Sequence, residues 1–162
     1  MINRRIELMS DKAMDVIDDM GFFKVVEGKK VIPSKYFGYM ASFGPSVIQS
    51  SLMQTLNAYN KESTKEGQER KKILTFMGKV MDESGCFSEQ QNNQSDNENE
   101  DNNKNKQYAE MLITYVRNKV GTASTPAITR IFIRKLVLDY ATACKNIMQT
   151  YPKEKTSTEV QQ

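Results

Sequence analysis

A run of sixteen polar residues, from Ser88 to Asn103, divides the chain and constrains what it can fold into. The run holds five acidic residues and neither a basic nor an apolar one. Because such a segment has no apolar surface to bury, it cannot offset the entropy lost on ordering, and we expect it to be disordered. The hydrophobic core must therefore come from the two stretches on either side of this acidic insertion.

Both flanking stretches show helical periodicity. Apolar residues recur at intervals of three and four, as at Ile6, Met9 and Ala13, which is typical of amphipathic helices. Cap signals support the pattern, such as Gly21 after the first helix and Ser63-Thr64 before the third. The pattern predicts five helices: residues 3–20; residues 34–59, interrupted at Gly44-Pro45; from after Thr64 through Met81; residues 106–120; and from the Ser124-Thr125-Pro126 signal to about Tyr151.

These helices predict an all-α fold, a compact five-helix bundle formed by residues 1–151 as a single domain. The disordered acidic insertion, residues 88–103, would lie between the third and fourth helices. Residues 22–32 hold two short apolar pieces around a turn, and we expect an extended segment or a small hairpin there. Residues 152–162 are polar and predict a flexible C-terminal tail.

The formal charge of the whole chain, +3, hides a more basic folded part. Without the insertion, 23 basic residues face 15 acidic ones, a formal charge of +8. The basic residues gather on two helical faces, and such faces either bind phosphate or simply face solvent. The candidates are Lys71, Lys72 and Lys79, beside Lys65, on the third helix and Arg130, Arg134, Lys135 and Lys145 on the fifth.

No residue pattern in the chain predicts catalysis. The chain has no histidine, so it lacks the commonest general base and the preferred zinc ligand. The thiols of Cys86 and Cys144 have no histidine to activate them, and we expect both to be ordinary buried thiols. The acidic run from Asp96 lacks the glycine and the final glutamate of a calcium loop. We expect no enzyme activity, no metal and no cofactor.

Residues 36–60 form the longest uncharged stretch, 25 residues, which is long enough to span a membrane. Serine, threonine, glutamine and asparagine side chains interrupt it, and Gly44-Pro45 breaks it, so burial in lipid would leave polar groups unsatisfied. The stretch is then either a central helix of the bundle or an interaction groove. With no secretory leader at the first residues, we expect a cytoplasmic protein without a membrane partner.

The fifth predicted helix suggests a contact between subunits. Its core face is wide and includes Phe132, Ile133 and Leu136, whereas Ile131 and Leu138 lie outside that face among basic residues. Isolated exposed apolar residues are common, but two of them seven residues apart also suit a narrow strip that packs on a neighbouring copy. Ile131 and Leu138 are therefore the candidate subunit interface.

Residues 36–59 carry a resemblance to a known family. Pro45, Val47-Ile48 and Ser51-Leu52 precede Gln54-Thr55-Leu56, and Ala58-Tyr59 close the segment. This segment resembles the small helical subunit of type III-B CRISPR effector assemblies, the Cmr complexes, in which a Leu-Pro-x-Leu-Ile segment leads to Gly-Leu-x-Gln-Thr-Leu-Ala-Phe. The length, the helical pattern and an insertion between helices also resemble that family.

The resemblance implies a non-catalytic, RNA-binding subunit of a ribonucleoprotein that serves antiviral defence. Copies would stack as a filament beside other Cmr subunits and hold target RNA and crRNA by phosphate contacts, while the crRNA supplies sequence recognition. The alternative from another class is a helical adaptor that binds only protein, with residues 36–60 as its groove and the lysines facing solvent.

Overall fold

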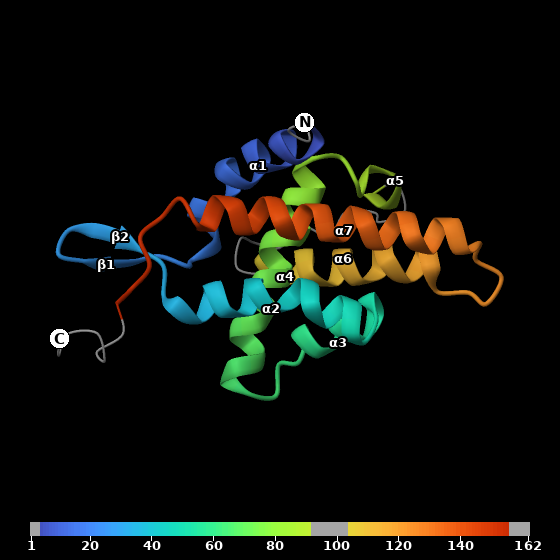
Figure 1. Cartoon of the computed structure of the whole chain (residues 1–162), viewed down its shortest axis with the longest axis horizontal. Helices are drawn as coiled ribbons and strands as arrows, with labels where there is room; N and C mark the ends of the chain where they lie inside the picture. The colour runs from blue at the N-terminus through green and yellow to red at the C-terminus, as the bar shows by residue number, and fades with distance from the viewer. Residues whose placement is uncertain (1–3, 92–103, 156–162) are drawn as a thin grey trace.

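The computed structural model of the chain describes residues 4–91 and 104–155 (Figure 1). These residues are mostly helical, which confirms the predicted class in its broad form. The described ranges contain six helices of eight or more residues: α1 (Arg4–Ile17), α2 (Ser34–Gln49), α3 (Leu52–Tyr59), α4 (Lys65–Glu83), α6 (Lys104–Val120) and α7 (Ala127–Met148). The shorter elements are η1 (Asp18–Met20), β1 (Lys24–Val26), β2 (Lys29–Val31) and the one-turn helix α5 (Ser88–Gln91).

The sixth long helix arises because residues 34–59 form two separate helices, and the predicted break at Gly44-Pro45 is wrong. Helix α2 continues through Pro45 and ends at Gln49. The chain breaks instead at Ser50 and Ser51, where the Ser51 hydroxyl oxygen accepts a hydrogen bond from the backbone amide of Gln54 at 3.1 Å. A serine that caps a new helix satisfies an amide that has no partner within that helix, and the pair of serines therefore sets the break.

The segment between α1 and α2 is a β-hairpin, so the fold is not purely α-helical. Strands β1 and β2 pair antiparallel, with Lys24 opposite Val31 and Val26 opposite Lys29. Glu27 and Gly28 form the two-residue turn with positive φ angles of 51° and 75°. This is the conformation that a tight hairpin turn with native twist requires. The hairpin projects from one end of the bundle (Figure 1).

The first residues of the predicted tail are held in place. The amide of Ile32 donates to the carbonyl of Pro152 at 2.9 Å, and the amide of Glu154 donates to the carbonyl of Ile32 at 2.9 Å. The rings of Phe23 and Tyr151 pack edge to face beside this contact, with centroids 4.7 Å apart. The predicted tail is therefore wrong for residues 152–154, and its last seven residues, 156–162, lie outside the described residues.

The start of the predicted acidic insertion also needs correction. Ser88 to Gln91 form the one-turn helix α5, and the Ser88 hydroxyl donates to the carbonyl of Gly85 at 2.9 Å. This local hydrogen bond stabilises a turn without any apolar burial. The remaining twelve residues of the insertion, 92–103, lie outside the described residues.

Helix α4 is the centre of the core. It crosses behind α7 in Figure 1 and packs against α6 and α1. Ile73, Leu74, Phe76 and Met77 are completely buried. At Gly78 the backbones of α4 and α6 approach so closely that a Cβ atom would lie 2.3 Å from the carbonyl oxygen of Tyr108. The fold depends on a residue without a side chain at this crossing.

This crossing predicts a specific loss of stability. Gly78→Ala should lower the free energy of unfolding by about 1–3 kcal/mol, because the methyl group meets backbone that cannot rotate away. The matched control is Gly38→Ala in α2, where a Cβ meets nothing within 4 Å. That change should raise the free energy of unfolding by about 0.5–1 kcal/mol, since alanine favours a helix interior over glycine. Urea denaturation of both variants measures the two effects. Equal stabilities would contradict the close backbone approach of α4 and α6 at Gly78.

Candidate nucleic-acid interface

The predicted basic face of α4 is largely neutralised by carboxylates. Lys71 is only 9% exposed, and its ammonium group pairs with Glu62 and lies 3.7 Å from Glu110. Lys79 lies 3.0 Å from the carboxylate of Asp19. The prediction that these lysines project into solvent is therefore wrong for Lys71, because α4 is surrounded by other helices. Of the three α4 lysines proposed for RNA, Lys72 alone is exposed, with its ammonium 5.7 Å from the Tyr36 ring.

The basic residues of α7 lie in three different settings. Arg130 and Arg134 are exposed near the beginning of the helix. Lys135 forms an ion pair of 2.9 Å with Asp139 one turn later. Lys145 is exposed in the last turn, far along the helix from the arginines. The structure therefore brings only Arg130 and Arg134 together as a pair.

These two arginines line a cavity of about 350 Å³ at the break between α2 and α3. The other lining residues come from the end of α2, the beginning of α3 and the end of α6. We call this the arginine cavity. Its lining residues are Val47, Ile48, Ser50, Ser51, Leu52, Met53, Val120, Arg130 and Arg134.

Arg130 is held against the wall of the cavity by the loop that precedes α7. One terminal nitrogen of its guanidinium donates to the carbonyl oxygen of Thr122 at 2.7 Å. A guanidinium carries five N–H donors in a rigid fork, so most of its donors remain for another acceptor. Among the residues that the structure describes, neither Arg130 nor Arg134 forms an ion pair with a carboxylate.

The absence of carboxylates here follows from two stretches of sequence that meet in the fold. Residues 36–60 carry no charge at all, and residues 111–138 carry five basic residues and no acidic one. Helices α2, α3, α6 and α7 bring these stretches together around the arginine cavity. The acid-free run 111–138 was not singled out from the sequence, although a simple charge count reveals it.

The same run contains a basic residue that the sequence prediction missed. Arg117 is exposed on α6, one turn before Val120, which lines the cavity. Two like charges one helical turn apart, as at Arg130 and Arg134, destabilise a helix by about 0.2–0.5 kcal/mol. Several cations around a cavity without a carboxylate therefore favour an anionic ligand.

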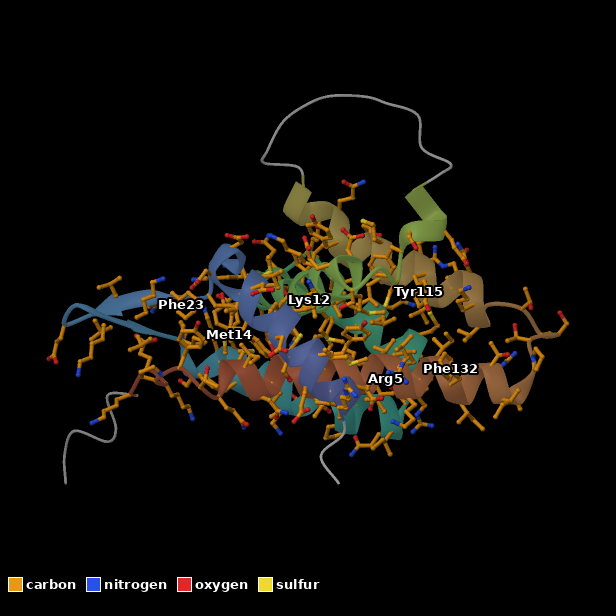
Figure 2. All side chains as sticks on the ribbon, turned by 90° about the horizontal axis from the view of Figure 1, so that it is seen from above. Arg5, Lys12, Met14, Phe23, Tyr115 and Phe132 are labelled. Carbon is orange, nitrogen blue, oxygen red and sulfur yellow. The ribbon has the colours of Figure 1, made fainter. Side chains whose placement is uncertain are left out.

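An apolar ridge lies beside the arginines on the outer face of α7. Ile128, Ile131 and Phe132 are 72%, 63% and 53% exposed. Phe132 was predicted in the core, but it lies at the edge between α7 and α1, where the Arg5 guanidinium is 5.8 Å from its ring centroid (Figure 2). Leu138, the second residue of the predicted strip, is only partly exposed and packs against the core.

The described residues offer little for nucleophilic or metal chemistry. No group of three or more histidine, cysteine, aspartate or glutamate residues that could hold a metal ion occurs among them. Cys86 Sγ lies 3.2 Å from the hydroxyl of Tyr140, and Cys144 is completely buried. Burial raises the pKa of both thiols, which keeps them protonated at neutral pH and weakens them as nucleophiles.

Three comparisons place the chain against known proteins. Protein-family models, curated proteins and solved structures give no match to it. The resemblance to the small Cmr subunit therefore stays a prediction from the sequence. In the part of the chain that the structure describes, no helix combines the length and apolar character needed to cross a membrane.

The thiols allow a direct check of the burial that the structure gives them. Because burial raises the pKa of Cys86, its thiolate should form at higher pH than that of free cysteine. Its reaction with Ellman's reagent at neutral pH should be about tenfold slower or more, and should accelerate as pH rises. Cys144 should react only after unfolding. A native protein whose two thiols react as fast as free cysteine would contradict these positions.

Proposed function

We propose that the chain is a non-catalytic RNA-binding subunit that holds RNA phosphates through the arginine cavity and the basic residues near it. The observation that carries the proposal is the pair of arginines, Arg130 and Arg134, in a cavity whose described lining contains no carboxylate. Arginine forks suit phosphate geometry, and contacts of this kind bind the backbone without reading the bases.

The biological setting that we propose is a type III-B CRISPR interference complex in the cytoplasm. The partners would be crRNA and target RNA, other subunits of the Cmr complex and neighbouring copies of this chain. Sequence recognition would come from base pairing with the crRNA, so the subunit would need no motif that reads bases. The resemblance of residues 36–59 to the small Cmr subunit supports this setting.

The proposed RNA surface differs from the first candidate set on α4. Lys71 and Lys79 are paired with carboxylates, and an RNA phosphate would have to displace those partners. Arg130 and Arg134 need no such exchange. Arg117 extends the surface along α6, while Lys72, Lys135 and Lys145 lie outside the cavity and are secondary contacts.

Removing the two guanidiniums tests the proposed surface. Arg130→Gln combined with Arg134→Gln should weaken binding of single-stranded RNA by about tenfold at low salt, since each lost phosphate contact removes counterion release. The slope of log affinity against log salt concentration should become shallower by about 0.7 for each lost contact. Fluorescence anisotropy with a labelled RNA at several salt concentrations measures both quantities.

A variant with the same change in charge is the control. Lys24→Gln combined with Lys29→Gln removes two charges from the hairpin, at the end of the molecule opposite the loop between α6 and α7 (Figure 1). This variant should bind RNA nearly as the unmodified protein does. Equal losses in the two double variants would mean that binding follows net charge, and the arginine cavity would not be the RNA surface.

The second candidate function is a helical adaptor that binds only protein, and the apolar ridge of Ile128, Ile131 and Phe132 favours it. Exposed apolar clusters of this kind mark protein contacts. Measuring RNA binding by the purified chain and by the assembled complex distinguishes the two functions. If neither retains RNA at low salt, the adaptor function is supported and the RNA function is contradicted.

In the proposed complex the same ridge would form the contact between stacked copies. Ile128→Ser combined with Ile131→Ser should leave the fold intact, because both side chains are mostly exposed, and should reduce the mass of the assembly in native mass spectrometry. Leu138→Ser is a useful comparison, since Leu138 is partly buried and its replacement should mainly lower stability. Unchanged assembly in the ridge variant would contradict the proposed contact.

A further inference from the structure

We infer that the arginine cavity receives one unpaired nucleotide of the bound RNA, with its base on the apolar wall and its phosphate on Arg130 and Arg134. The inference rests on the proposed RNA-binding function and adds a defined ligand to it. A phosphate surface alone would need charge but no cavity. The structure combines both, with five apolar side chains and two guanidiniums around about 350 Å³.

The apolar wall results from the break between α2 and α3. Val47 and Leu52 are buried beneath it, whereas Ile48 is 66% exposed at the rim. Met53 is partly buried and completes the wall. A cavity of this size with a mainly apolar lining and a few polar groups is typical of a site for a small organic group rather than for an inorganic ion.

The two serine hydroxyls at the break are used differently within the protein. The Ser50 hydroxyl donates to the carbonyl of Ser46 at 2.8 Å and also lies 3.2 Å from the Thr55 hydroxyl. The Ser51 hydroxyl caps α3 through the Gln54 amide. The Ser51 O–H remains as one neutral donor, and Arg130 and Arg134 are the charged donors among the described lining residues, which favours an anion.

A nucleotide joins the two chemical properties that the cavity requires. Its flat base buries apolar surface and stacks on guanidinium planes, and its phosphate accepts paired N–H donors. No aromatic residue lines the described cavity, so the stacking partners would be the arginines and aliphatic side chains. A base that is already paired in a duplex cannot enter, which selects an unpaired position of the RNA.

The spacing of the cations favours RNA over an acidic peptide. Arg130 and Arg134 lie one turn apart on α7, and Arg117 lies one turn before the cavity residue Val120 on α6. Consecutive phosphates of one strand would neutralise several of these cations, whereas a single carboxylate beside an apolar side chain would neutralise one. We therefore argue for a nucleotide within a strand.

The test separates the base from the phosphate. The unmodified protein should bind oligouridylate about five- to tenfold more tightly than an abasic ribose phosphate strand of equal length, because only the first carries bases that can stack. Ile48→Ala combined with Met53→Ala should remove that preference without changing the salt dependence. Ile48 is exposed and Met53 is only partly buried, so the double variant should keep its fold, which circular dichroism checks.

The matched control is Leu8→Ala combined with Met14→Ala, which removes two exposed apolar side chains from α1, where they are 62% and 51% exposed. It should keep the preference for the strand with bases. Loss of the preference in both double variants would overturn the inference, since the effect would not belong to the cavity.

The remaining outcomes are equally decisive. Equal binding of the two strands would overturn the base site while leaving the phosphate-binding function intact, and failure to bind either strand would contradict the proposed function itself. Free uridine monophosphate should bind far more weakly than the oligomer. If it binds as tightly, or if a glutamate-phenylalanine peptide displaces the RNA from the cavity, the ligand is not a nucleotide within a strand.

Discussion

The crossing of α4 and α6 at Gly78 is the constraint on which the rest of the structure depends. It lets α4 run through the middle of the molecule, where its apolar side chains are buried on several sides. Where neighbouring elements cover such a helix, its lysines must lie near carboxylates, and this applies to Lys71 and Lys79. Asp19, Glu62 and Glu110 supply them. Lys72 stays exposed on α4, and Arg117 on α6 and Arg130 and Arg134 on α7 are exposed without a carboxylate partner among the described residues.

The sequence allowed prediction of those features that depend on local chemistry. Thr64 caps α4 as expected, accepting a hydrogen bond from the Gly67 amide at 3.0 Å, and Gly21 has the left-handed conformation that ends the first helical segment. The outcome at Pro45 was not predicted, because tertiary packing supports a helix that local preference would break. Lys71 and Phe132 were misplaced since a helical wheel shows periodicity but not which neighbours cover each side.

The candidate site could be predicted only in part for a related reason. The sequence predicts Arg130 and Arg134 as basic residues of one helix face, but their distinction from Lys71 and Lys79 lies in their surroundings. The uncharged stretch 36–60 is evident in the sequence, yet its meaning depends on a second acid-free stretch 50 residues later in the chain. Only the fold shows that the two share one cavity, and the proposed binding of RNA phosphates follows from that meeting.

The pairing of Ile32 with residues 152–154 has a mechanical consequence. Two backbone hydrogen bonds join the chain after α7 to the end of the hairpin, and the Phe23 and Tyr151 rings pack beside them. A force applied at the C-terminal side of Glu154 must break these bonds before it reaches the last turn of α7. These contacts with the hairpin thus protect the C-terminal end of α7 from fraying. The arginines of α7 lie nearer its other end.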